Sequence, residues 1–301
     1  MGIFLISGLT LRSGDVKTAL ESWGALLFGF VSILALTPLV APAVAALPIQ
    51  PAGLAMGLAL FRCMPTTLSS GVALTAQLGG NTALALALTV GTNIAGIFTV
   101  PYVLSTLLGG GTGVYLPPEP LLKGLAANIL APLLAGMAVR KVLPPPMARV
   151  IIVSKKALGL LSSALLMTVP WSQVSQSASS VKALSPESVA ALVAAALGTH
   201  MAVSIANRLA AAVLGLGRGL EAVEGRKVQQ TVTLLSSGKT LPVAVTVLGL
   251  LNGALGDTGL MIVACVLAHV SGIVFDSVLV AFWRRRADID SGAAVVYNFG
   301  G

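Results

Sequence analysis

The sequence predicts an all-α integral membrane protein, and composition and charge spacing carry that prediction. Of the 301 residues, 56% are hydrophobic and 9% are charged, and the mean hydropathy is +0.95, whereas soluble domains carry about 25% charged residues. No charge interrupts 22–61 or 63–118, and each stretch exceeds the roughly 20 apolar residues that one spanning helix needs. Each stretch must therefore hold more than one helix.

Apolar runs separated by polar residues or by Pro and Gly give the expected order of elements. They predict a fragment at 1–11 and then spans near 22–46, 52–78, 81–108, 120–139, 156–172, 187–216, 228–251 and 258–283. If these spans alternate across the bilayer, thirteen of the eighteen basic residues fall on one side, which favours the C-terminus on the cytoplasm-equivalent side. The net charge of +8 thus has a membrane explanation, and no nucleic-acid partner is expected.

The start of the chain predicts that upstream sequence is missing. The first ten residues are apolar and lack the basic segment and cleavage site of a targeting peptide. Polar residues follow abruptly at 12–15, as they would after the second half of a helix. We therefore expect the first span and part of the next to be absent from this chain.

Two halves with matching segments are predicted, namely 1–138 and 156–301, joined by a basic, proline-containing linker at 139–155. The tetrapeptide Leu-Ser-Ser-Gly at 68–71 recurs at 235–238, beside Pro65 in the first half and Pro242 in the second. The span after each copy also matches, because Asn-Ile-Ala-Gly-Ile at 93–97 parallels His-Val-Ser-Gly-Ile at 269–273.

Interrupted hydrophobic segments at corresponding positions of two halves indicate a transport site, because unwound backbone inside a membrane must line a cavity rather than face lipid. Helix ends at the bilayer midplane bind anions through free N–H groups or cations through free carbonyls. The polar residues at the two predicted breaks are therefore binding candidates: Thr66, Thr67, Ser69 and Ser70 at the first, and Ser236, Ser237, Lys239 and Thr240 at the second. Singly, such hydroxyls often only bond to their own helix.

Ionisable residues inside spans form a second group of candidates. An ammonium at mid-membrane costs about 2.5 to 3.5 kcal/mol, so Lys239 is expected to be functional or paired. His269 is either a core residue or part of the site, and its equivalence to Asn93 brings both into the candidate site.

For the remaining ionisable residues the structural interpretation is at least as good. His200 has no matching residue and is expected to be structural. Asp276 shares a helix face with His269 and is expected to pair with a buried base. Arg62 and Arg208 either snorkel, pair or bind substrate. The sequence contains no catalytic or nucleotide-binding motif and only two apolar-embedded cysteines, so we expect neither an enzyme nor a cofactor.

Several of these segments resemble the bile acid:sodium symporter family, in particular its branch of plant plastidial probable sodium/metabolite cotransporters. The matching stretches are 8–12, 63–81, 96–101, 236–242 and 269–272. The resemblance implies ten helices in two inverted repeats, with the fourth and ninth helices broken and crossing at the site; this chain, starting within the second helix, would hold about nine. It also implies a multi-pass secondary transporter of a small organic anion, and a chloroplast envelope location.

The resemblance also implies roles for individual residues. Ser69, Ser70 and Thr89 fall where the family places sodium ligands, and Thr240 and His269 fall where substrate or ion contacts lie. Where sodium-coupled members carry a shared glutamate, this sequence has Ser236, and Lys239 follows three residues later. A fixed ammonium there would take the place of the cation, so proton coupling is expected in place of sodium coupling. Two alternatives on the same fold are a non-transporting regulator of ion homeostasis and an ion channel.

Overall fold

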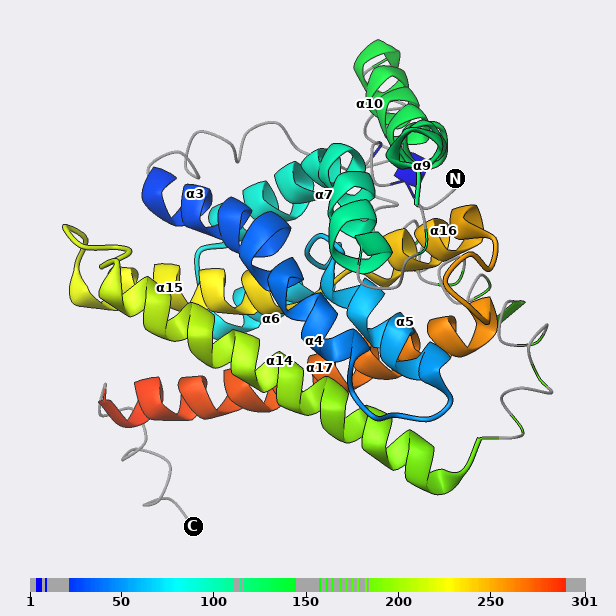
Figure 1. Cartoon of the computed structure of the whole chain (residues 1–301). Coiled ribbons are helices and arrows are strands. Elements are labelled where there is room, and N and C mark those ends of the chain that lie inside the picture. The colour runs from blue at the N-terminus through cyan, green and yellow to red at the C-terminus, as the bar shows by residue number, and fades with distance from the viewer. Residues whose placement is uncertain are drawn as a thin grey trace.

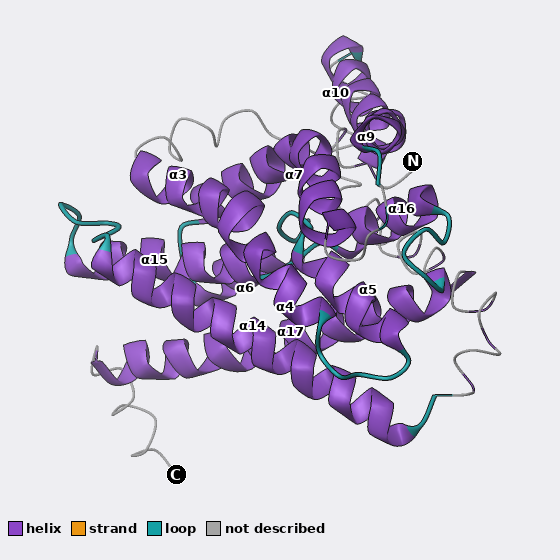
Figure 2. Cartoon of the chain, in the orientation of Figure 1, coloured by secondary structure: helices purple, strands orange, loops and turns teal. Residues whose placement is uncertain are grey.

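A computed structural model describes residues 22–110, 114, 116–144 and 184–290, together with 4–6, 9 and scattered positions between 157 and 182. Within these residues the regular secondary structure is entirely helical (Figure 2). Six helices in the described part of the chain are long and apolar enough to cross a membrane. They are Trp23–Ala45, Thr82–Gly109, Pro118–Val142, Pro186–Val213, Ala222–Leu251 and Thr258–Ala287. The prediction of an all-α, multi-pass membrane protein is confirmed.

The helices of the first half include several local irregularities. The first long helix contains α3 (Trp23–Val31), a π-helical turn (Ser32–Leu36), a 3-10 turn (Thr37–Val40) and α4 (Ala41–Ala45). It is followed by α5 (Ala52–Arg62), α6 (Ser70–Leu78) and α7 (Thr82–Leu104), which a π turn extends over Ser105–Gly109. The helices α9 (Pro118–Leu125) and α10 (Ala131–Val142) are joined by a π turn at Ala126–Leu130.

The described helices of the second half follow the same order. After α14 (Pro186–Val213) come α15 (Ala222–Ser237), α16 (Leu241–Leu251) and α17 (Thr258–Asp290). Each half thus places a long helix before an interrupted pair and another long helix after it. The predicted span at 156–172 is described only at scattered positions, which are helical, and most of the linker at 139–155 lies outside the described residues. The fragment at 1–11 is described only at 4–6 and 9, where it is helical. The division at 139–155 stays a prediction.

Local chemistry explains where the helices begin and end. The Asn81 side chain accepts a hydrogen bond from the Leu84 amide at 2.9 Å and so caps the start of α7. Ser185 caps α14 in the same way through the Ser188 amide at 3.1 Å. Gly79, at φ 70°, ends α6 in the left-handed conformation that glycine adopts at no steric cost.

Packing of the interrupted helices against long helices organises the interior (Figure 1). Helix α5 lies against α17, α15 against α7, and α14 contacts both α15 and α17. Along α14, polar and small residues are buried, whereas Met201, Ile205, Leu209 and Val213 recur every four residues and are exposed. A stripe of exposed apolar side chains at helical spacing is what a lipid-facing surface requires.

The contact of α5 with α17 depends on Gly57. A Cβ atom at this position would lie 2.5 Å from the Met261 carbonyl oxygen and 2.6 Å from its Cα. Both atoms belong to backbone, so a side chain can be accommodated only if the two helices separate. Close approach through small residues is a common way for membrane helices to pack.

We expect Gly57→Ala to destabilise the protein by about 1–3 kcal/mol, because overpacking a tight helix contact costs that much. A matched control is Gly198→Ala in α14, where an added Cβ meets nothing within 4 Å and alanine has the higher helix propensity. Thermal unfolding of the purified variants in detergent should show a clear fall in melting temperature for the first and none for the second. Equal melting temperatures would contradict the packing described here.

Candidate functional site

The chain is unwound at the two predicted positions. Residues 63–69 separate α5 from α6, and residues 238–240 separate α15 from α16. Pro65 removes a backbone donor in the first break, and Pro242 lies in the first turn of α16, where a missing N–H group and a fixed φ favour a helix start. The breaks expected at 65–71 and 236–242 are thus confirmed, with small differences in their bounds.

Hydrogen bonds between the two breaks show that they cross. The Thr240 amide donates to the Pro65 carbonyl at 3.0 Å. The Thr66 hydroxyl donates to the carbonyl of Leu235, in the last turn of α15. A Cβ on Gly71 would lie 3.0 Å from the Leu235 side chain, so glycine permits this approach. Each break supplies partners for backbone groups that the other leaves open.

The paired residues of the following helices occupy equivalent places. In α7, Asn93 Nδ2 donates to the Thr66 carbonyl at 3.0 Å. In α17, His269 Nδ1 lies 3.2 Å from the Lys239 carbonyl, which requires the proton to be on Nδ1. Each side chain therefore ties the last helix of its half to a carbonyl in the break of that half. This arrangement supports the correspondence between the two halves.

A third irregular segment meets the crossing, in the first long helix. The Thr37 amide donates to the Ser32 carbonyl in the π turn, and Pro38 has no N–H group, so the Ile33 carbonyl has no donor from its own helix. Lys239 Nζ fills this place at 3.0 Å. The Thr37 hydroxyl also donates to the Ser236 carbonyl at 3.4 Å. The prediction of a plain span at 22–46 missed this feature, although Pro38 was its signal.

A small cavity beside the crossing brings together most of the ionisable residues of the membrane interior. It has room for about one water molecule. Two cationic side chains line it and are almost completely buried, Arg62 at 1% exposure and Lys239 at 2%. The other lining residues are Phe61, Thr67, His200, Ser237, Gly238, Ala268, His269, Gly272, Ile273 and Asp276.

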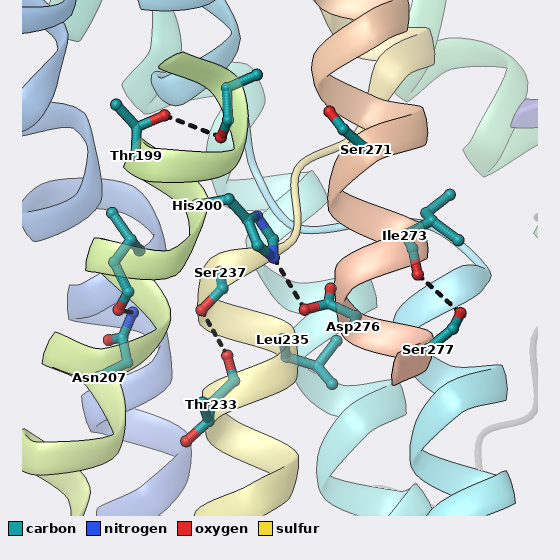
Figure 3. Close-up of polar contacts among 12 residues, drawn as sticks. Thr199, His200, Asn207, Thr233, Leu235, Ser237, Ser271, Ile273, Asp276 and Ser277 are labelled. Atoms are coloured by element: carbon teal, nitrogen blue, oxygen red, sulfur yellow. Dashed lines mark hydrogen bonds and ion pairs between the residues drawn. The ribbon is translucent and has the colours of Figure 1, made fainter. Parts of the chain in front are cut away.

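His200 and Asp276 form a buried pair across α14 and α17, with Nε2 and Oδ1 2.8 Å apart (Figure 3). The expectation that Asp276 pairs with a buried base is confirmed. In Figure 3 the two side chains point toward each other, and the hydroxyl of Ser237, which is drawn below His200, donates to the Thr233 carbonyl at 2.8 Å. Sequence reasoning assigned His200 a structural role and missed its place on the cavity wall. A Cβ on Gly272 would lie 3.3 Å from its ring, so glycine makes room for the histidine.

The predicted site residues separate into three groups. Thr67, Ser237, Lys239 and His269 line the cavity. Thr66, Asn93, Ser236 and Thr240 are buried at the crossing. The hydroxyls of Ser236 and Thr240 have no hydrogen-bond partner within the described residues. The third group is the proposed sodium ligands, Ser69, Ser70 and Thr89.

The three proposed sodium ligands differ in their surroundings. Ser69 is exposed, Ser70 is half-buried, and Thr89 is buried with an unpartnered hydroxyl. No hydrogen bond among the described residues joins them. No group of three or more metal-binding His, Cys, Asp or Glu side chains occurs in the described part of the chain either. A role for these hydroxyls in ion binding stays a prediction.

Interrupted helices that cross inside a bundle of membrane spans, beside a buried polar cavity, define a secondary transporter. The sequence pattern of the SBF-like CPA transporter family matches residues 1–285, and the chain belongs to that family.

Two groups of relatives agree with this assignment. The chain is 43% identical over 287 residues to the probable sodium/metabolite cotransporter BASS4, chloroplastic, of Oryza sativa, with 95% of this chain and 68% of the relative covered. The Arabidopsis thaliana relative of the same name is 42% identical over 286 residues, covering 95% of this chain and 65% of its own length. Sodium/bile acid cotransporter 7 of Rattus norvegicus is 30% identical over 171 residues, covering 56% and 48%.

The hydroxyl of Thr66 offers a direct test of the crossing. We expect Thr66→Val to lower the free energy of unfolding by about 0.5–1.5 kcal/mol, because it leaves the Leu235 carbonyl without this partner. Thr246→Val is the control, since that hydroxyl donates only to the Pro242 carbonyl one turn earlier in its own helix. Thermal unfolding of both variants measures the difference. A larger effect at Thr246 would count against the crossing.

Proposed function

We propose that the chain is a carrier that moves a small organic anion across a membrane by alternating access, with its binding site at the crossing of the two breaks. The observation that supports this most is the charge of the cavity wall. Arg62 and Lys239 face one carboxylate, Asp276, so with neutral histidines the wall carries a net charge of +1. A buried excess of positive charge is costly unless an anion compensates it.

Movement of helices is part of this proposal, because a metabolite is larger than a cavity with room for about one water molecule. Binding from either side requires the cavity to widen. The two interrupted helices are held together by the hydrogen bonds at the crossing, so we infer that they form a core against which the remaining helices move. Unwound backbone at such a core is typical of alternating-access transporters.

The coupling ion is a separate part of the proposal. Lys239 holds its ammonium against the Ile33 carbonyl, a ligand that a sodium ion would also accept. We infer that the ammonium takes the place of a cation and that transport is coupled to protons. Sodium coupling is the alternative suggested by the names of the relatives. The candidate sodium ligands would then be Ser69, Ser70 and Thr89, together with backbone carbonyls of the two breaks.

Uptake by the purified protein in proteoliposomes tests the carrier function. Saturable uptake of a radiolabelled organic anion, with accumulation driven by an ion gradient, supports a carrier. Non-saturating flux at rates above those of carriers would identify an ion channel instead. Absence of flux for every anion and cation tested would favour a non-transporting regulator of ion homeostasis.

The coupling proposal predicts uptake that is unchanged when potassium replaces sodium and that rises as the external pH falls. The reason is linkage: a bound anion favours the charged ammonium of Lys239, so substrate and proton bind together. Lys239→Gln should remain folded and lose the pH dependence. The charged or titratable groups that face Lys239 are Arg62 and Cys63 near the end of α5, His200 on α14, and His269 and Asp276 on α17.

Parallel His269→Gln and His200→Gln variants are the controls, because each removes one titratable group and leaves Lys239 in place. Retained pH dependence in both would assign the effect to the lysine. Uptake that requires sodium and survives Lys239→Gln unchanged would overturn the proton-coupling proposal.

We also propose a location in the plastid envelope, on the basis of the chloroplastic relatives in rice and Arabidopsis. Immunodetection of the full-length protein in purified envelope membranes tests this location. Detection in another membrane fraction only would refute it and leave the carrier proposal intact.

A further inference from the structure

We propose that Arg62, the last residue of α5, is the residue that pairs with the anionic group of the substrate. This inference rests on the proposed carrier function and assigns its charge recognition to one side chain. The group it would bind is a carboxylate, whose two oxygens match the planar donor arrangement of a guanidinium. Lys239 is also buried, but its ammonium already donates a hydrogen bond to the Ile33 carbonyl.

Arg62 has almost no hydrogen-bond partners among the described residues. Its side chain is 1% exposed, and neither Nε nor Nη1 has a hydrogen-bond partner among the residues that the structure describes. The one bond of the guanidinium is a long contact of 3.4 Å from Nη2 to the Ala196 carbonyl. Nε and Nη1 carry most of the donors of an arginine side chain. A buried guanidinium in this condition is strongly destabilising unless an acceptor with negative charge reaches it.

The neighbouring groups do not fill that role. Asp276 is bonded to His200, and no oxygen of its carboxylate lies within 4.0 Å of the guanidinium among the described residues. The thiols of Cys63 and Cys265 donate hydrogen bonds to the Ala59 and Gly57 carbonyls, respectively. A water molecule in the cavity would accept one or two hydrogen bonds but would leave the charge uncompensated.

The charged groups of the two buried cations, Lys239 and Arg62, lie in different surroundings. Lys239 Nζ is anchored to the Ile33 carbonyl, so its ammonium is directed toward the first long helix. Arg62 lies at the carbonyl end of α5, where the helix dipole stabilises a cation, and directly before the first break. Arg62 is one of the residues that line the cavity beside both breaks, so an anion that enters a widened cavity would come close to its guanidinium.

Arg208 provides a matched comparison within a span. It lies on α14, is half-buried, and its Nη1 donates to the Gln229 side-chain oxygen at 2.6 Å. Its guanidinium therefore has a partner in the protein, and it is not part of the cavity wall. Removing the charge of an arginine that is hydrogen-bonded within the protein should lower the melting temperature. Removing the charge of an arginine that binds the substrate anion should instead abolish the stabilisation by that anion.

The experiment measures thermal unfolding of the full chain in detergent, in sodium chloride, sodium pyruvate and sodium sulfate at equal ionic strength. We expect pyruvate, at about ten times its dissociation constant, to raise the wild-type melting temperature by about 3 °C relative to chloride. Arg62→Met should abolish this shift, and in chloride it should unfold at the wild-type temperature or above it. Arg62→Lys should retain part of the shift, because it keeps the charge but not the fork of donors.

Arg208→Met is expected to unfold at a lower temperature than wild type and to keep the pyruvate shift. A structural role of Arg62 predicts the opposite pattern, with a lower melting temperature in chloride and an undiminished pyruvate shift in Arg62→Met, and this result would overturn the inference. A wild-type shift with sulfate but not with pyruvate would overturn the carboxylate assignment. Absence of any shift in the wild type would overturn the inference as a whole.

Uptake in proteoliposomes separates this inference from the proposed function. If the wild type transports no anion but shows a pyruvate shift that Arg62→Met abolishes, the carrier proposal fails and the binding role of Arg62 stands. If the wild type transports pyruvate and Arg62→Met transports it with an unchanged KM, the carrier proposal stands and the role of Arg62 is refuted.

Discussion

Backbone hydrogen bonding inside the membrane is the constraint on which this structure depends. A helix that stops at mid-span exposes amides and carbonyls that water cannot reach, and each unsatisfied group costs several kcal/mol. Here each break supplies a hydrogen-bond donor to a carbonyl of the other. The Thr240 amide donates to the Pro65 carbonyl, and the Thr66 hydroxyl donates to the Leu235 carbonyl. Neither break would be stable alone, so their crossing is required by the interruptions themselves, and the cavity forms next to it.

The buried charged side chains impose a second constraint, because each needs a partner inside the protein. Lys239 is tolerable because the π turn and Pro38 free the Ile33 carbonyl, so an irregularity in one helix stabilises an ion on another. Asp276 is held by His200 across α14 and α17. These contacts join the first long helix to the second break and α14 to α17. They leave the Arg62 guanidinium as the least satisfied charged group of the cavity wall.

The sequence was sufficient for the fold class and the positions of the breaks, because apolar runs, prolines and the repeated Leu-Ser-Ser-Gly are local signals. The crossing of the breaks was expected from the family resemblance. It was sufficient for the pairing of Asp276 with a base, but not for the identity of that base, because His200 lies 76 positions away and no periodicity connects two different helices. The π turn at Ser32–Leu36 was missed for a related reason: a Thr-Pro pair inside a span is compatible with a kink, a π turn or a plain helix, and the partner that decides among them is Lys239.

The described helices of the two predicted halves follow the same order but differ in chemistry, and that difference bears on function. Asn93 and His269 hold equivalent carbonyls, at Thr66 and at Lys239. The first half meets the crossing with an amide, neutral hydroxyls and the guanidinium of Arg62, which keeps its proton. The second half brings an imidazole and an ammonium to the same place. Because these two groups lie on only one side of the crossing, the site responds asymmetrically to a proton. A carrier needs such an asymmetry if protonation is to favour one arrangement of the helices over the other, since a ligand shifts an equilibrium only by its differential affinity for the two states.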